Sequence, residues 1–470
     1  MSNFPSYMSF FLRSYNNVSH QNFMVQPASS GVLNAHRQMQ FTLPTNAMLH
    51  LSKTRLYFTM STASGNADTA GRLAAAKSIL DRVEISAGGV SLSSGCASTS
   101  VLSQCIDNMR TIEEDPVTSH TELYRRTSGV NGRSIIGVTE AYTNINNSQC
   151  FSIELGPWFQ TMAPNMLPTQ LFPTLQVTLY LSGNASVVSS CKLTPVAGST
   201  PAFVDPVLPG ASGIQATYTV DNYTLGVSAY SLDDGVFDQT LATRLNSSEG
   251  LEASFCNYES FSNTFSTGTT LVSSAASSLD KVIVAFRAAG YDDPKPAIGV
   301  KGYNNALTAG QDANGVLDQP STHGGAKFLN NASNFTSPST ALPSAGDDNW
   351  ASQPNMSIQV NNVRFPSYDA RIGAQTYELT KEAFETDKTA SQSLVEYMEN
   401  RCQVAYKFNL PASQAMRARS GLNLQGSNSQ IRISAVGDKT NLSTDGNIMV
   451  FVESTQVIKI MAGKQLMVVS

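Results

Sequence analysis

The chain has 470 residues, of which 41% are hydrophobic and only 14% are charged, a composition typical of a globular protein rich in strands and loops. Its formal net charge is −5, and neither end carries a cluster of Lys and Arg, so the sequence argues against direct, specific binding of nucleic acid. The length predicts two or three ordinary domains, or two unusually large all-β domains.

The termini and the cysteines predict a soluble protein made in a reducing compartment. The N-terminus, MSNFPSYMSFFLRSYNN, lacks the basic start and the long apolar run of a signal peptide or a membrane span. The cysteines form no CxxC pair, which favours free thiols over a disulfide framework. They are Cys96, Cys105, Cys150, Cys191, Cys256 and Cys402.

Residues 1–37 are predicted to be an N-terminal arm without regular structure. Aromatic side chains are spaced among Ser, Asn and Gln there, and neither helical nor strand periodicity is sustained. Two interpretations stay open: a disordered tail, or an extended arm that lays its aromatic side chains on a neighbouring subunit.

Residues 38–190 carry the first set of strand patterns. In HLSKTRLYFTM, alternation places Leu51 on the face of Tyr57, opposite Leu56 and Phe58. In DRVEISAGGVSLSSG, Val83 and Ile85 alternate with polar residues, and Gly88-Gly89 supplies the positive φ of a tight hairpin turn. Residues 98–110 change to helical spacing, which predicts one short helix inside a β region.

The stretch ELGPWFQTMAPNMLPTQLFPTLQVTLYLSG ends this first set. Leu175, Val177, Leu179 and Leu181 alternate with polar or amphipathic residues, which predicts a strand with one face in a core. We expect the corner around Trp158 to close the end of that core.

Residues 191–214 contain several Pro, Gly and Ser residues and are predicted to connect two domains. Residues 215–470 then carry a second set of strands. A bulge is expected near Asp221 and Asn222, and SLDKVIVAFR is apolar on both faces, which predicts a central strand.

Within this second set, residues 300–357 are predicted to be a long exposed loop, and residues 380–401 a helix. Three strands, SQIRISAVG, NIMVFVESTQVIKI and KQLMVVS, end the chain. The predicted fold class is therefore all-β: two consecutive antiparallel sandwiches with a few short helices in loops.

No catalytic motif is found. The sequence contains no GxSxG, GxxxxGK[ST], GxGxxG after a strand, or HExxH, and it predicts no catalytic, cofactor-binding or metal-binding residues. Its histidines lack metal-type spacing, so we interpret them as surface or hydrogen-bonded structural residues. They are His20, His36, His50, His120 and His323.

Adjacent acidic residues are the other candidates for chemistry. Neighbours in an extended chain point to opposite sides, so such pairs suit solvated turns better than a two-carboxylate mechanism; a calcium-binding loop is the alternative. His120 and Glu122 share one strand face without a nucleophile, which indicates a surface hydrogen-bonded pair. The acidic pairs are Asp233-Asp234, Asp292-Asp293 and Asp347-Asp348.

The order of these patterns resembles that of the double jelly-roll major capsid proteins of icosahedral DNA viruses, a lineage that includes virophages, polinton-like elements and nucleocytoplasmic large DNA viruses. In that family a Pro-Trp-Phe-like corner precedes a Leu-Pro loop and a strongly alternating strand, as Pro157 to Leu181 do here. DRVEISAGGVSLSSG and, more weakly, SSLDKVIVAFR are also similar to strands of the family.

The resemblance covers about residues 38–470 and implies two jelly rolls per chain. It implies a homotrimer that forms a pseudo-hexameric capsomer of the virion shell, without enzymatic activity. The implied partners are neighbouring capsomers and penton and minor capsid proteins, and whether an internal membrane lies beneath the shell stays open. Whether assembly occurs in the host cytoplasm or nucleus stays open.

Two other functions are compatible with many short strands. A receptor- or carbohydrate-binding adhesin or spike is the alternative, since long exposed loops on a rigid scaffold are common recognition surfaces. A hydrolase on a β scaffold is the third hypothesis, and only the scattered acidic residues support it.

Overall fold

The structure is a computed structural model, and it describes most of the strand-forming parts of the chain. The described residues are 18–63, 69–73, 76–93, 96–109, 135–136, 148–193, 203–206, 217–232, 235–246, 250–264, 268–287, 354–385, 402–409, 421–425, 430–436 and 447–469. The predicted loop at 300–357 therefore lies outside the described residues up to position 353, and Asn355 already begins a strand.

The first sandwich consists of two antiparallel sheets. Sheet I has the order β1-β14-β4-β10, with β2 paired to β14 and β9 paired to β4; sheet II has the order β3-β11-β6-β7. The strands of sheet I are β1 (Val18–Val25), β2 (Leu33–Asn34), β4 (Met48–Ala63), β9 (Ser148–Glu154), β10 (Met166–Pro168) and β14 (Thr217–Leu232). Those of sheet II are β3 (Gln38–Thr42), β6 (Leu80–Ala87), β7 (Val90–Ser93) and β11 (Leu175–Leu181).

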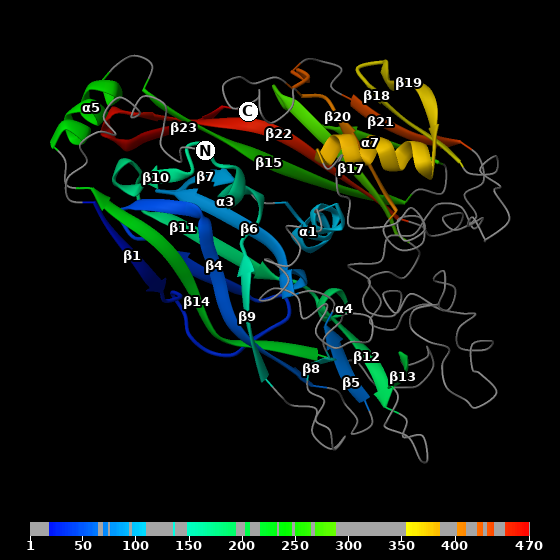
Figure 1. Cartoon of the computed structure of the whole chain (residues 1–470), viewed down its shortest axis with the longest axis horizontal. Helices are drawn as coiled ribbons and strands as arrows, with labels where there is room; N and C mark the ends of the chain where they lie inside the picture. Colours follow the sequence, from blue (N-terminus) through cyan, green and yellow to red (C-terminus); the bar gives the residue numbers. More distant parts are fainter. Residues whose placement is uncertain are drawn as a thin grey trace.

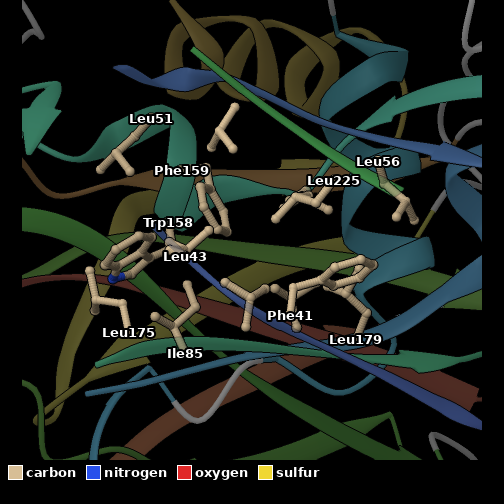
Figure 2. Close-up of a cluster of buried hydrophobic side chains, with 14 of the residues drawn as sticks. Phe41, Leu43, Leu51, Leu56, Ile85, Trp158, Phe159, Leu175, Leu179 and Leu225 are labelled. Carbon is tan, nitrogen blue, oxygen red and sulfur yellow. The ribbon is translucent and has the colours of Figure 1, made fainter. Parts of the chain in front are cut away.

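The first hydrophobic core lies between these sheets. In β11, Leu175, Val177, Leu179 and Leu181 are all buried while the intervening residues are half-buried, so the predicted alternation is confirmed. Each buried Leu contributes about 1.5 to 3 kcal/mol through removal of apolar surface from water. Figure 2 shows side chains of both sheets meeting in this core, among them Phe41, Leu51, Leu56, Ile85, Leu179 and Leu225.

Strand β14 belongs to the first sandwich, although the sequence analysis assigned residues from 215 onward to the second jelly roll. It lies between β1 and β4 in sheet I and pairs with β4 from Thr217 to Tyr230. Its inward residues Val220, Leu225 and Val227 are buried in the first core, which explains the pairing. We therefore place the proposed division between the two jelly rolls after β14.

Part of the predicted arm is also a strand. All eight residues of β1 pair with β14, from Val18 opposite Leu232 to Val25 opposite Leu225. This strand could not be predicted from its residues because β1 is an edge strand with few buried side chains, so the usual alternation of apolar and polar residues is weak. Residues 1–17 lie outside the described residues.

Two irregularities in the pairing of β4 with β14 change which residues of these strands point into the core. The register shifts between Asp221 and Thr224, where Asn222 has φ 49°, so the predicted bulge is confirmed. A second shift lies between Gly226 and Ser228. Because of it, Leu51 and Leu56 are both fully buried in the core, so the prediction that they lie on opposite faces is wrong.

The β6–β7 hairpin turns at Gly88 and Gly89, as predicted. Both glycines have positive φ, +55° and +87°, and Ala87 pairs with Val90. A Cβ atom at Gly88 would lie 2.6 Å from Cβ of Pro173, whereas one at Gly89 would meet nothing within 4 Å. The two positions therefore share backbone strain but differ in available space.

We expect Gly89→Ala to destabilise the protein by about 1 to 2 kcal/mol, the cost of a left-handed backbone with a side chain. Gly88→Ala should cost about 1 to 3 kcal/mol more, because the added methyl group overlaps Pro173. Urea unfolding of the two variants measures the difference. Equal losses would show that the turn relaxes away from Pro173.

A small peripheral sheet extends from the first sandwich. Sheet III has the order β13-β12-β5-β8 and is formed by β5 (Thr69–Leu73), β8 (Ile135–Ile136), β12 (Val188–Leu193) and β13 (Phe203–Pro206). Strand β13 and the end of β12 lie within the predicted connector of residues 191–214, so that segment is not purely a linker. Two short helical segments lie near it, η2 (Ala76–Ile79) and α4 (Asn184–Val187), whereas η3 (Thr169–Leu171) lies at the start of β4.

The second sandwich is built from sheets IV and V. Sheet IV has the order β15-β22-β17-β20 with β23 paired to β22, and sheet V has the order β16-β21-β18-β19. Sheet IV contains β15 (Leu251–Thr264), β17 (Leu279–Arg287), β20 (Gln403–Lys407), β22 (Asn447–Met461) and β23 (Gln465–Val469). Sheet V contains β16 (Thr269–Ser273), β18 (Asn355–Val360), β19 (Val363–Arg371) and β21 (Gln430–Val436).

The predicted central strand is β17, between β22 and β20. Val282 and Val284 lie in the second core, and Ile283 and Ala285 are buried on the opposite face. The three predicted C-terminal strands are β21, β22 and β23. The helix predicted at 380–401 is only partly supported: α7 spans Ala374–Phe384, and residues 386–401 lie outside the described residues.

The described chain is therefore all-β with short helices, arranged as two sandwiches, as predicted (Figure 1). The remaining helical segments are α1 (Thr99–Asn108), α3 (Pro157–Thr161), α5 (Gly235–Leu245) and η8 (Ala462–Lys464). Among the described residues, no helix combines the length and the hydropathy that crossing a membrane requires.

Candidate functional site

The two sandwiches meet through an apolar contact that uses long strands of sheet IV. One end of the pair β15–β22 lies in the second core, and its other end joins the first core through Leu251, Phe255, Ile458 and Ile460. Figure 1 shows β15, β22 and β23 running across the top of the first sandwich. The same strand pair therefore covers both cores and holds the sandwiches together.

Two helices cover the face of sheet IV that points away from the second core. Helix α1 comes from a loop of the first sandwich, and its Val101, Leu102 and Cys105 pack in one cluster with Ile283 and Phe451 of the second. These helix residues have the predicted spacing, and all three are buried. Helix α7 adds Ala383, and Gln403 Nε2 donates a 2.8 Å hydrogen bond to the backbone carbonyl of Cys105.

The Trp158 corner forms the third contact between the sandwiches. Trp158 is 4% exposed, and its ring centroid lies 5.1 Å from that of Phe159 and 6.1 Å from that of Phe255 in β15. Just beyond the corner, Ala163 and Ser254 exchange backbone hydrogen bonds of 2.7 and 2.9 Å. The prediction that this corner lies in the core is confirmed, and the corner also docks the second sandwich, which the sequence did not reveal.

A small cavity lies beside this corner. Its volume is about 30 Å³, and its lining residues include Cys96, Trp158, Cys256 and Tyr258. Sites for organic ligands are about ten times larger or more, so this cavity has room for water rather than for a substrate.

A buried polar cluster crosses sheet IV next to the cavity. The Glu453 carboxylate accepts hydrogen bonds from the Tyr258 hydroxyl at 2.5 Å and from Lys281 Nζ at 3.1 Å. The Asp280 carboxylate accepts from Thr455 at 2.5 Å and from Ser278 at 3.2 Å. We call Tyr258, Asp280, Lys281, Glu453 and Thr455 the sheet IV polar cluster.

The only group of potential metal ligands found among the described residues overlaps this cluster. The ligand atoms of Cys256, Asp280 and Glu453 lie within 4.8 Å of one another. Their chemistry does not fit a metal, because Lys281 already neutralises Glu453 and hydroxyl groups donate to both carboxylates. Burial also raises the pKa of the Cys256 thiol well above its ordinary value, which favours the neutral form. The arrangement is better suited to joining strands than to binding an ion.

Asp280 gives this cluster a pH dependence. Its pKa is raised from 3.8 to about 6, chiefly by burial; the hydrogen bond from Thr455 opposes the shift, and the charge of Glu453 adds to it. The folded state therefore holds this proton more tightly than the unfolded chain does. The resulting stabilisation is fully present below about pH 4 and is lost as the pH rises through about 6.

We expect Asp280→Asn to remove this dependence. Relative to the variant, the wild-type chain should lose stability between pH 4 and pH 7, by an amount on the order of 3 kcal/mol, since one pKa unit corresponds to about 1.4 kcal/mol. Urea unfolding of both proteins at the two pH values measures the difference. A constant difference would contradict the raised pKa.

Some of the histidine and acidic residues considered as site candidates lie among the described residues, and others lie outside them. His20 Nε2 lies 2.7 Å from Oγ of Ser228, and Nδ1 of the buried His50 lies 3.1 Å from Oγ of Ser52, which fits hydrogen-bonded structural roles. Burial, with a smaller effect from Lys53, lowers the pKa of His50. His120, Glu122, His323 and the three acidic pairs lie outside the described residues.

The sheet IV polar cluster is absent from the sites that the sequence predicts. Its members come from three strands that are up to about 200 positions apart in the chain. Glu453 interrupts the apolar run of NIMVFVESTQVIKI, and Asp280 precedes the apolar run of β17. An acidic residue within a strand that is otherwise apolar indicates a buried carboxylate with polar partners, and this was the signal in the sequence.

Comparison with known proteins supports the fold. No protein-family model and no curated protein sequence matches the chain. Solved viral structures are similar to it, and three of them illustrate the match. The PBCV-1 virus capsid matches with a TM-score of 0.56 and 12% identity, over 97% of this chain and 98% of that chain. The Faustovirus major capsid protein matches with a TM-score of 0.56 and 8% identity, over 95% and 91%.

The third similar structure comes from the Sputnik virophage. It matches with a TM-score of 0.52 and 10% identity, over 97% of this chain and 89% of that chain. In all three the likeness covers at least 95% of this chain, so it includes the strands of both sandwiches. The chain therefore has the fold of double jelly-roll viral capsid proteins.

Proposed function

We propose that this protein is the major structural subunit of an icosahedral virus shell. The observation that carries the proposal is the pairing of two sandwiches in one chain, with a likeness to viral capsid structures that covers at least 95% of this chain. In this proposal the protein is located in the virion and catalyses no reaction.

The capsomer in this proposal is a homotrimer. Three copies with two sandwiches each present six similar units around a three-fold axis, which gives a block of pseudo-hexagonal outline. Such a block requires that the two sandwiches of one chain keep a fixed orientation. The shared strands β15 and β22, the Trp158 corner and helix α1 supply that rigidity.

The proposed partners are neighbouring capsomers and penton and minor capsid proteins. The net charge of −5 supports an arrangement in which this chain does not itself package the genome, because proteins that neutralise nucleic acid carry basic segments.

Mass measurement and imaging of the purified protein test this proposal. Light scattering should give three times the chain mass of 50.3 kDa, and negative-stain electron microscopy should show roughly hexagonal blocks or closed shells. A stable monomer that binds glycans would instead support the adhesin alternative. A stable monomer without such binding would contradict both.

A further inference from the structure

Strand β1 is the outer strand of sheet I and has one unpaired side. It pairs with β14 along all eight residues without a register shift. Among the described residues, no strand pairs with its other side. Figure 1 shows β1 beside β14 at the left of the first sandwich. Its free backbone N–H and C=O groups are available to another strand.

The sequence of β1, VSHQNFMV, lacks the features that usually protect such an edge. Natural edge strands carry charged residues, prolines or bulges that prevent pairing with other chains. Strand β15, which ends sheet IV, contains Glu252 and Glu259, and β19, which ends sheet V, contains Pro366. Among the described strands that end a sheet, β1 is the longest with neither Pro nor an Asp, Glu, Lys or Arg residue.

Apolar side chains on both faces of β1 are exposed. Phe23 is 39% exposed on the face of the buried Val227, and Met24 is 58% exposed on the opposite face. Gly226 has no side chain to separate Met24 from Tyr57, so these two side chains lie over its backbone and form one apolar surface. An added strand would cover apolar area on both faces as well as pair the free backbone groups.

We propose that β1 pairs antiparallel with β1 of a second copy of this chain and so joins neighbouring capsomers. The inference rests on the proposed function. A contact between identical acidic chains is favoured where the surface carries no formal charge, because like charges directly opposite each other are destabilising. Strand β1 meets this condition over its whole length.

The symmetry of this contact determines where it acts. An antiparallel pair of identical strands is related by a two-fold axis, so the contact is isologous. A two-fold contact cannot close a ring of three subunits. The β1 pair therefore connects one trimer to the next and leaves the trimer itself unaffected. A pair centred on Gln21 or Asn22 aligns seven of the eight residues.

Charge reversal tests the pairing. One variant carries Gln21→Lys with Asn22→Lys, and the other carries Gln21→Asp with Asn22→Asp; both positions are exposed, so folding should be unaffected. A matched control carries Ser262→Lys with Asn263→Lys at exposed positions of the edge strand β15. Light scattering reports trimers, and electron microscopy counts assembled particles at equal protein concentration.

We expect each β1 variant alone to form trimers but to give at least about tenfold fewer particles, since about 1.4 kcal/mol of repulsion changes an association constant tenfold. An equimolar mixture of the two variants should restore particles, because Lys then faces Asp across the two-fold axis. The β15 control should assemble as the wild-type chain does.

Three results would overturn the inference. The Lys variant could assemble as well as the wild type, the mixture could fail to restore particles, or the β15 control could lose particles to the same extent. Each of these leaves the trimer, and with it the proposed function, intact. A wild-type chain that stays monomeric would overturn the proposed function and the β1 contact together.

Discussion

Replacing Trp158 with alanine should lower the free energy of unfolding by about 3 to 5 kcal/mol, the range for removing a buried large aromatic side chain. The indole is 4% exposed and packs against Phe159 of its own corner and Phe255 of the second sandwich. The variant therefore loses contacts in both sandwiches at once. We expect a single unfolding transition at lower temperature, which calorimetry measures.

Two further variants separate burial from side-chain identity. Among the described residues, Trp158 Nε1 has no hydrogen-bond partner, so Trp158→Phe removes volume without breaking a hydrogen bond and should cost less than the alanine variant. Tyr368 is 50% exposed, and Tyr368→Ala should change stability by about 0.5 kcal/mol or less. Equal losses from Trp158→Ala and Tyr368→Ala would show that the corner is not packed as described.

Replacing Lys281 with methionine should destabilise the protein by a similar amount, about 3 to 5 kcal/mol. The side chains of Lys281 and Glu453 are only 15% and 8% exposed, so the variant leaves the Glu453 carboxylate buried without its positive partner. Tyr258 still donates a hydrogen bond to it but supplies no charge. Urea unfolding at neutral pH measures the loss.

The double variant Lys281→Met with Glu453→Gln should recover much of this stability, because it removes the uncompensated charge while a carboxamide oxygen can still accept from Tyr258. Lys459 and Glu252 form an exposed ion pair that serves as the control. Lys459→Met should cost about 1 kcal/mol or less. If the double variant is no more stable than Lys281→Met, the buried charge is not the cause of the loss.

Local patterns sufficed for much of the fold. The alternation of β11, the two glycines of the β6–β7 turn and the helical spacing of α1 all depend on neighbouring residues, and each was predicted correctly. The resemblance to double jelly-roll capsid proteins also depended on such local patterns in their order along the chain, and the solved structures support the same fold.

Features that depend on distant pairing could not be predicted in the same way. The assignment of β14 to sheet I follows from its position between β1 and β4, and nothing within its own residues distinguishes one sandwich from the other. The bulge that buries both Leu51 and Leu56 is set by the partner strand. The contact of Trp158 with Phe255 joins residues almost 100 positions apart, so a buried aromatic was predictable but its partner was not.

The position of β14 also determines when the first sandwich can form during synthesis. Sheet I has β14 between β1 and β4, so a nascent chain that has reached only residue 214 has an N-terminal edge strand with nothing to pair with. Leu225 and Val227, which β14 contributes to the first core, leave the ribosome later still. Sheet I therefore cannot form completely until residue 232 has left the ribosome, and until then apolar side chains of the N-terminal half stay exposed to aggregation and to chaperones.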